Sequence, residues 1–88
     1  MIEREVVVKN RAGIHTRPAA TLVKIAGKYK CEFYIEKDNF QINGKSIIGV
    51  MSLAAEQGAK LDLVFDGDDE NEACEEILGL FERGFDEL

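Results

Sequence analysis

With 88 residues, the chain is long enough for one small domain, which we place over residues 1–88. Hydrophobic residues make up 45% of the chain and charged residues 32%, which is ordinary for a globular domain, and no apolar run is long enough to span a membrane. The formal net charge of −6 makes nucleic acid a poor partner for the chain as a whole.

Four segments have the patterns of β-strands. Residues 2–8 and 31–36 place apolar and polar side chains on opposite faces, with Phe33 and Ile35 facing inward in the second segment. Residues 40–43 follow a turn at 37–39, so the second and third strands are predicted to form a hairpin. Residues 61–65 alternate again, with Leu61, Leu63 and Phe65 facing inward.

Three segments are predicted as helices. Pro18 fits the first turn of a helix that continues over residues 19–26 and ends at Gly27, with an apolar face of Ala19, Leu22, Val23 and Ala26. Ser46 is predicted to be the N-cap of a short helix from residue 47 to about 53. A last helix follows Asp69, which stands at capping-box spacing from Glu72, and its buried stripe is Ala73, Ile77, Leu80 and Phe81, flanked by Cys74.

The predicted order is strand, helix, strand, strand, helix, strand, helix. Four strands with an apolar inner face need a cover, and three helices on one side would supply it. The fold class is therefore α+β, a two-layer open-faced β-sandwich.

Charge and cysteine content add further expectations. Residues 1–60 carry ten Lys/Arg and six Asp/Glu, whereas residues 61–88 carry one Arg and eleven Asp/Glu. The first five residues are too charged for a secretory signal, so we expect a cytoplasmic protein. Cys31 and Cys74 lack metal-site spacing and the chain has a single histidine, so we expect free thiols, no metal site and no cofactor.

The most informative stretch is residues 13–20, which holds the only histidine and the only proline. His15 falls at or just before a helix N-terminus, where unpaired backbone N–H groups attract anions, phosphate above all. A neutral imidazole there is a nucleophile, and the Arg17 guanidinium can offer a fork of N–H donors to phosphoryl oxygens. On spacing alone, a surface histidine or a cap without chemistry is the commoner case.

Two surfaces beside these residues are candidates for partner binding. Arg17, Lys24 and Lys28 recur at steps of seven and four, which predicts a cationic face along the first helix that suits acidic proteins. The short helix after Ser46 has too few polar positions, so Ile47, Ile48 and Met51 are expected to be partly exposed as a docking patch.

Both motifs resemble one family. Gly-Ile-His-Thr-Arg-Pro-Ala at residues 13–19 resembles the signature Gly-[Ile/Leu]-His-Ala-Arg-Pro-Ala of HPr, the histidine phosphocarrier of the bacterial sugar phosphotransferase system. Lys-Ser-Ile-Ile-Gly-Val-Met-Ser-Leu at residues 45–53 resembles the run found in the HPr subtype of bacteria that have HPr kinase. Thr16 stands where alanine is usual, and Ile48 stands where methionine is common. The resemblance covers the whole chain.

The resemblance implies an antiparallel sheet with strand order 1-4-2-3 and a monomeric phosphoryl carrier rather than a stand-alone enzyme. His15 would accept a phosphoryl group on Nδ1 from enzyme I, with phosphoenolpyruvate as the ultimate donor, and pass it to enzyme II A domains. Arg17 would be the phosphate clamp. HPr kinase/phosphorylase would phosphorylate Ser46, and a transcriptional regulator is a further implied partner. The residues expected to contact partners are Thr16, Lys24, Lys28, Ile47, Ile48 and Met51.

Three other functions are alternatives for a chain of this size and charge. A purely regulatory module that acts through Ser46 stays open, although such relatives usually lack the phosphorylatable histidine that this chain has at position 15. An acyl-carrier protein is also small and acidic, but that family is all-helical with Asp-Ser-Leu at its attachment serine, unlike residues 45–47. A hydrolase is weaker still, because the sequence has no second histidine and no triad constellation.

Overall fold

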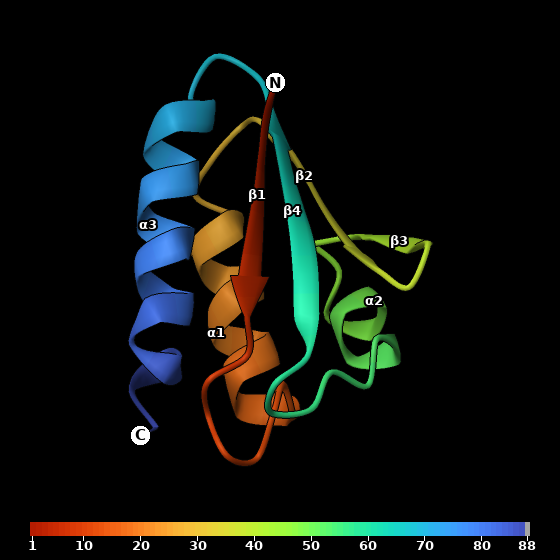
Figure 1. The fold of residues 1–88 in the computed structure, drawn as a ribbon. Coiled ribbons are helices and arrows are strands. Elements are labelled where there is room, and N and C mark those ends of the chain that lie inside the picture. The colour runs from red at the N-terminus through yellow and green to blue at the C-terminus, as the bar shows by residue number, and fades with distance from the viewer. Residues whose placement is uncertain (88) are drawn as a thin grey trace.

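The computed structural model describes residues 1–87, and its frame is one four-stranded sheet (Figure 1). The strands are β1 (Ile2–Val7), β2 (Glu32–Lys37), β3 (Phe40–Asn43) and β4 (Lys60–Asp66). Every neighbouring pair is antiparallel, and the order across the sheet is β1-β4-β2-β3. Asp38 and Asn39 both have positive φ, 51° and 68°, as the tight turn of the β2–β3 hairpin requires. The strands and their order confirm the prediction.

Three helices complete the fold: α1 (Thr16–Ala26), α2 (Ile47–Ser52) and α3 (Glu70–Glu82), followed by a 3₁₀ turn, η1 (Gly84–Asp86). Figure 1 shows α1 and α3 side by side along one face of the sheet, while α2 lies near β3. This arrangement confirms the predicted open-faced α+β sandwich. None of the helices within residues 1–87 has the length and hydrophobicity needed to cross a membrane.

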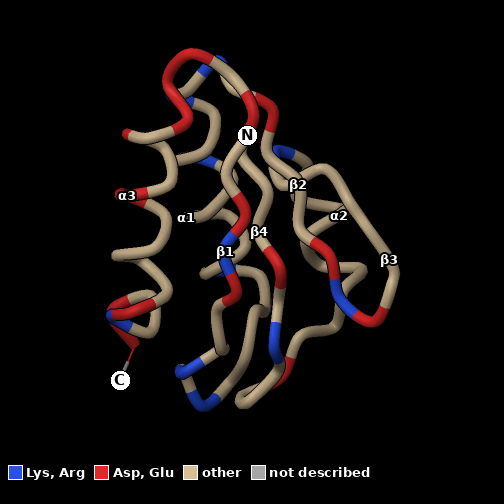
Figure 2. Tube along the Cα trace, turned by 45° about the horizontal axis from the view of Figure 1, so that its top comes forward, with Lys and Arg blue, Asp and Glu red and all other residues tan. Residues whose placement is uncertain are grey.

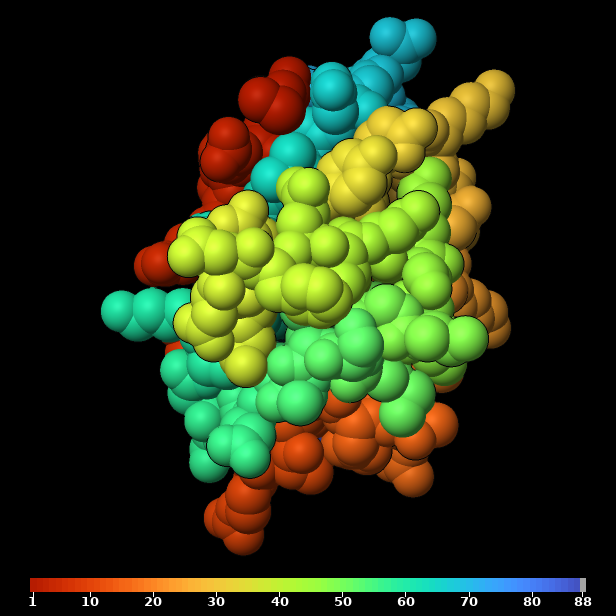
Figure 3. All heavy atoms as spheres, turned by 90° about the vertical axis from the view of Figure 1, so that its right-hand side faces the viewer, coloured from red at the N-terminus to blue at the C-terminus, as the bar shows by residue number. Residues whose placement is uncertain are grey.

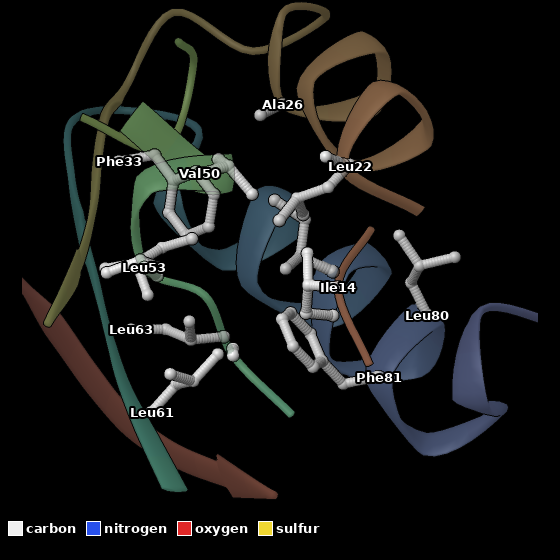
Figure 4. Close-up of a cluster of buried hydrophobic side chains, with 14 of the residues drawn as sticks. Ile14, Leu22, Ala26, Phe33, Val50, Leu53, Leu61, Leu63, Leu80 and Phe81 are labelled. Carbon is white, nitrogen blue, oxygen red and sulfur yellow. The ribbon is translucent and has the colours of Figure 1, made fainter. Parts of the chain in front are cut away.

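The core lies between the sheet and the helices (Figure 4). Strand β4 contributes alternate buried side chains, and Phe65 stacks on Phe33 of β2 with ring centroids 4.9 Å apart. Helix α1 buries Pro18, Ala19, Leu22 and Ala26, whereas Val23, which was expected on the same face, is only half-buried. The stripe predicted for α3 is buried in full, and it includes Cys74.

Both cysteines are buried free thiols, as expected. Burial raises the pKa of Cys31 and of Cys74, because a thiolate loses its hydration there.

The predicted capping box of α3 is wrong. Asp69 is the N-cap residue, but its side chain caps nothing on its own helix. Its two carboxylate oxygens instead accept hydrogen bonds from the backbone N–H groups of Lys30 (2.8 Å) and Cys31 (2.9 Å). The Asp69 carboxylate, which the sequence spacing predicted to cap α3, therefore accepts hydrogen bonds from the loop before β2 instead. Donation from Lys30, the largest cause, lowers the pKa of Asp69, because these bonds favour the ionised form.

These two hydrogen bonds predict that the effect of Asp69→Ala on stability depends on pH. A carboxyl with a lowered folded-state pKa stabilises the fold above its ordinary value of 3.8, and that stability is lost as the pH falls through the folded pKa. We therefore expect Asp69→Ala to lower the melting temperature at neutral pH, with a difference from the parent that shrinks on acidification. Melting curves across acidic pH measure it, with Asp68→Ala as the control because Asp68 is exposed and accepts no hydrogen bond within residues 1–87. A pH-independent difference would rule out this role for the carboxylate.

Candidate functional site

The loop between β1 and α1 is fixed from both sides before it reaches His15. The Gly13 N–H donates to the Asn10 carbonyl (3.1 Å) and the Ile14 N–H donates to the Ala55 carbonyl (2.9 Å). Gly13 has φ +75°, and a Cβ at this position would lie 2.5 Å from the Ala55 oxygen, so the position requires glycine. Ile14 is buried in the core (Figure 4). The next residue is therefore held in place at the surface.

His15 is the N-cap residue of α1, as predicted. Its backbone is extended (φ −89°, ψ −165°), and its carbonyl accepts the first helical hydrogen bond from the Ala19 N–H at 3.0 Å. The side chain is 43% exposed and makes no capping hydrogen bond. Within residues 1–87 the Thr16 and Arg17 N–H groups donate to no acceptor. Two backbone donors at the positive end of the helix dipole thus stand next to the imidazole, open to an anion.

A carboxylate from the other end of the chain contacts the ring. Oε1 of Glu87 lies 3.3 Å from Nε2 of His15, and the same oxygen accepts a hydrogen bond from Nδ2 of Asn10 at 3.2 Å. The Asn10 amide also donates to the Gly13 carbonyl at 2.6 Å. Sequence reasoning missed both Glu87 and Asn10. Glu87 is 72 residues from His15 and lies among many other acidic residues, so no local pattern marks it.

This contact distinguishes the two ring nitrogens. An ionised carboxylate can only accept hydrogen bonds, so Nε2 of a neutral His15 ring carries the hydrogen that it donates to Glu87. The lone pair then belongs to Nδ1. A nucleophilic nitrogen on the residue that begins a helix with open backbone donors is an arrangement that can accept an electrophilic group bearing negative oxygens.

The predicted clamp and contact residues of α1 are accessible. Thr16 and Arg17 are exposed in the same turn that follows His15, and Lys24 is exposed further along the helix. Within residues 1–87 neither Arg17 nor Lys24 forms an ion pair with an acidic side chain. The Arg17 guanidinium therefore keeps its hydrogen-bond donors for a ligand.

Lys28 does not belong to this helical face, which corrects the prediction. Helix α1 ends at Ala26, and the Lys28 ammonium lies 2.9 Å from Oε2 of Glu76 on α3. The Tyr29 hydroxyl donates to the other oxygen of Glu76, and this bond raises the pKa of Tyr29 to about 12. Lys28 thus helps to tie the end of α1 to α3. The acidic residues of α3 and of the loop before it are red in Figure 2.

The second motif begins α2 as predicted. Ser46 is the N-cap, and its Oγ accepts a hydrogen bond from the Gly49 N–H at 3.1 Å. Three apolar side chains of α2 are exposed, as expected: Ile47 (37%), Ile48 (80%) and Met51 (43%). Helix α2 packs against α1, and Figure 3 shows it in green on a face shared with the orange segment that contains the first motif. The two motifs are therefore neighbours in space.

The described part of the chain offers no metal centre. Within residues 1–87 no three or more His, Cys, Asp and Glu side chains gather in a way that could hold a metal ion.

Comparisons with known proteins identify the family. The family described as PTS HPr component phosphorylation site matches residues 2–83. Phosphocarrier protein HPr of Treponema pallidum is 42% identical over 87 residues, which cover 99% of each chain. The HPr-like protein Crh of Halalkalibacterium halodurans is 42% identical over 83 residues, which cover 94% of this chain and 99% of Crh.

A solved structure matches equally well. The crystal structure of HPr-C-His from Thermoanaerobacter tengcongensis superposes with a TM-score of 0.96 at 43% identity, and the match covers 100% of this chain and 99% of that one. Sequence, fold and the two motifs therefore agree. The chain belongs to the HPr family of the bacterial sugar phosphotransferase system.

Proposed function

We propose that this protein is a cytoplasmic phosphocarrier whose His15 accepts a phosphoryl group from enzyme I and passes it to enzyme II A domains. The observation that carries the proposal is the position of the His15 ring at the N-cap of α1, beside two open backbone N–H groups. Membership of the HPr family supports enzyme I as the donor and enzyme II A domains as the acceptors.

The proposed transfer needs no proton relay. The Nδ1 lone pair of His15 forms a bond to phosphorus, and the bond between phosphorus and the donor breaks with its electron pair left on the donor. In the second step the acceptor attacks phosphorus, and the electron pair of the Nδ1–P bond returns to the ring. In this proposal the Arg17 guanidinium and the amides of Thr16 and Arg17 bind the phosphoryl oxygens, which carry most of the charge during transfer.

A two-stage transfer experiment tests the carrier role. The protein is incubated with enzyme I and phosphoenolpyruvate, purified, and then mixed with an enzyme II A domain. We expect one phosphoryl group to be taken up per chain and then lost to the acceptor domain. A phosphorylated chain that no enzyme II A domain could discharge would not be a carrier.

We further propose that HPr kinase/phosphorylase phosphorylates Ser46. A phosphate at the N-terminus of α2 interacts favourably with the helix dipole, while its charge repels acidic partners that approach the same face. Incubation with this kinase and ATP, followed by mass spectrometry, should locate one phosphate on Ser46 and none on Ser46→Ala. Modification at another residue of the parent chain would refute the assignment.

Phosphorylation at Ser46 is expected to slow uptake at His15. The phosphomimetic Ser46→Asp should therefore lower the rate of transfer from enzyme I without unfolding the protein, and added salt should restore part of the rate because salt screens charge repulsion. Ser52→Asp is a matched control, since Ser52 is exposed at the far end of the same helix. Equal slowing by both substitutions would show that the effect is not specific to the regulatory position.

The proposed partner surface joins the two motifs. It combines the exposed apolar side chains of α2 with exposed polar side chains of α1. A transcriptional regulator is one partner that the family resemblance implies. Its proposed residues are Thr16, Lys24, Ile47, Ile48 and Met51. Lys28 is left out because it lies beyond the end of α1 and pairs with Glu76. That the protein is a monomer stays a prediction, which light scattering of the purified chain tests.

A second candidate function is regulation alone, through Ser46. The similarity to the HPr-like protein Crh favours keeping it. The two functions differ in their first step, because a regulatory module needs no transfer from enzyme I. Uptake at His15 followed by discharge to an enzyme II A domain supports the carrier, whereas modification by the serine kinase alone supports the regulator.

A further inference from the structure

We propose that Glu87 is a positioning residue for His15: its carboxylate holds the hydrogen on Nε2 and balances the charge that the ring gains when Nδ1 is phosphorylated. The inference rests on the proposed carrier function and deepens it. Nε2 of His15 lies 3.3 Å from Oε1 of Glu87.

The carboxylate is held from a second side. Nδ2 of Asn10 donates to the same oxygen of Glu87 at 3.2 Å and to the Gly13 carbonyl at 2.6 Å. Asn10 is fully buried, and both of its amide hydrogens are directed to acceptors, so its orientation is determined by the loop. The Glu87 side chain is itself only 16% exposed. A buried donor thus fixes the oxygen that meets the ring.

The backbone before Glu87 is bent in a way that the packing must enforce. Gly84, Phe85 and Asp86 have φ of 58°, 57° and 60°, and the last two are not glycine, so this left-handed run is unfavourable by itself. Phe85 is buried and meets Phe81 of α3 edge to face, with ring centroids 4.8 Å apart. Figure 1 shows the chain leaving α3 toward the end of the fold where the β1–α1 loop lies. The anchored Phe85 therefore directs the chain to His15.

The basic residues Lys9 and Arg83, which are close in the sequence to Asn10 and Glu87, are paired with other acids. Lys9 lies 3.3 Å from Oε2 of Glu82, and Nε of Arg83 lies 3.1 Å from Oδ1 of Asp86. Glu87, in contrast, has hydrogen-bond contacts with Asn10 and His15 among the described residues. The ring is thus the only titratable group among residues 1–87 that this carboxylate contacts by hydrogen bonding.

The contact suits both directions of transfer. When Nδ1 forms its bond to phosphorus and the donor's bond breaks, Nε2 keeps its hydrogen, so the ring becomes a cation. The Glu87 carboxylate balances that charge without taking the proton, as the orienting acid of a catalytic triad does. When the Nδ1–P bond breaks, its electron pair returns to Nδ1 and the ring leaves as a neutral imidazole. No proton has to move in either step.

Two substitutions of Glu87 distinguish its effect on the orientation of the His15 ring from the effect of its charge. Glu87→Gln keeps an oxygen that can accept from Nε2 but removes the charge, whereas Glu87→Ala removes both. Glu82→Ala is the matched control, because Glu82 is an exposed acid near the same end of the chain that pairs with Lys9 instead. Circular dichroism of each variant verifies the fold.

Nitrogen NMR of the labelled His15 ring and the rate of transfer from enzyme I are the two readouts. We expect Glu87→Ala to increase the share of the Nδ1–H tautomer and to slow transfer roughly 10- to 100-fold, by analogy with the loss of activity when a partner that orients a metal-binding histidine is removed. Glu87→Gln should keep more of the parent tautomer while still slowing transfer, and Glu82→Ala should match the parent in both.

The outcomes distinguish this inference from the carrier function itself. A parent chain that enzyme I phosphorylates, together with a Glu87→Ala variant that has the parent tautomer and the parent rate, would overturn the role of Glu87 alone. A parent chain that takes up no phosphoryl group would overturn the carrier function and the charge balance together. Altered tautomers and slower transfer in Glu87→Ala, against an unchanged control, would support the inference.

Discussion

Replacement of His15 by alanine is expected to abolish phosphoryl uptake from enzyme I and phosphoenolpyruvate. The chain has no other histidine, so no second imidazole can take over. The fold should persist, because the ring is 43% exposed, it caps no N–H group of α1, and the first helical hydrogen bond uses the backbone carbonyl of residue 15. Labelled phosphoenolpyruvate measures the uptake, and circular dichroism measures the fold.

Asn71→Ala serves as the control for the histidine variant. Asn71 is exposed on α3, and its replacement should leave uptake at the parent level. Acid-labile phosphate on the His15→Ala variant would show that another residue is the acceptor.

Arg17→Ala is expected to have the second-largest effect, a slower transfer by an intact protein. One charge-assisted hydrogen bond to a phosphoryl oxygen contributes about 1.5–3 kcal/mol. If that contact is made in the transition state only, its loss slows transfer roughly 10- to 150-fold. The fold should be unaffected, since Arg17 is exposed and forms no ion pair within residues 1–87. Single-turnover transfer from phosphorylated enzyme I measures the rate.

Lys24→Ala provides the comparison on the same helix. Lys24 is exposed but further from the N-terminus of α1, so it should act on encounter with acidic partners, and its smaller effect should fade at high ionic strength. An Arg17→Ala variant that transferred at the parent rate would show that Arg17 does not bind the phosphoryl group during transfer.

The parts of the fold that depend on local patterns could be predicted from the sequence. In strand β4 the buried residues Leu61, Leu63 and Phe65 alternate with the less buried Asp62 and Val64, and this period of two is a property of the segment itself. The place of His15 at the start of α1 was likewise predictable, because Pro18 is confined to the first helical turn. The N-cap role of Ser46 was predictable as well, because serine is a preferred N-cap residue.

Contacts between segments that are far apart in the sequence could not be predicted. Asp69 has the spacing of a capping box with Glu72, yet its carboxylate accepts hydrogen bonds from the backbone N–H groups of Lys30 and Cys31. Lys28 continued the spacing of a helical face, but the helix ends before it. Glu87 contacts His15 after a turn in which Phe85 packs against Phe81 of α3, 72 residues away from the histidine along the chain. Such contacts depend on the assembled fold, and one sequence without its structure carries no mark of them.

The central claim is that the His15 ring carries the phosphoryl group, and NMR of the parent protein after treatment with enzyme I and phosphoenolpyruvate tests it most directly. The account predicts one phosphoryl group bonded to Nδ1 of His15, stable in alkali and lost in acid, as a P–N bond requires. An acid-stable phosphate, or an acid-labile one on any atom outside the His15 ring, would contradict it.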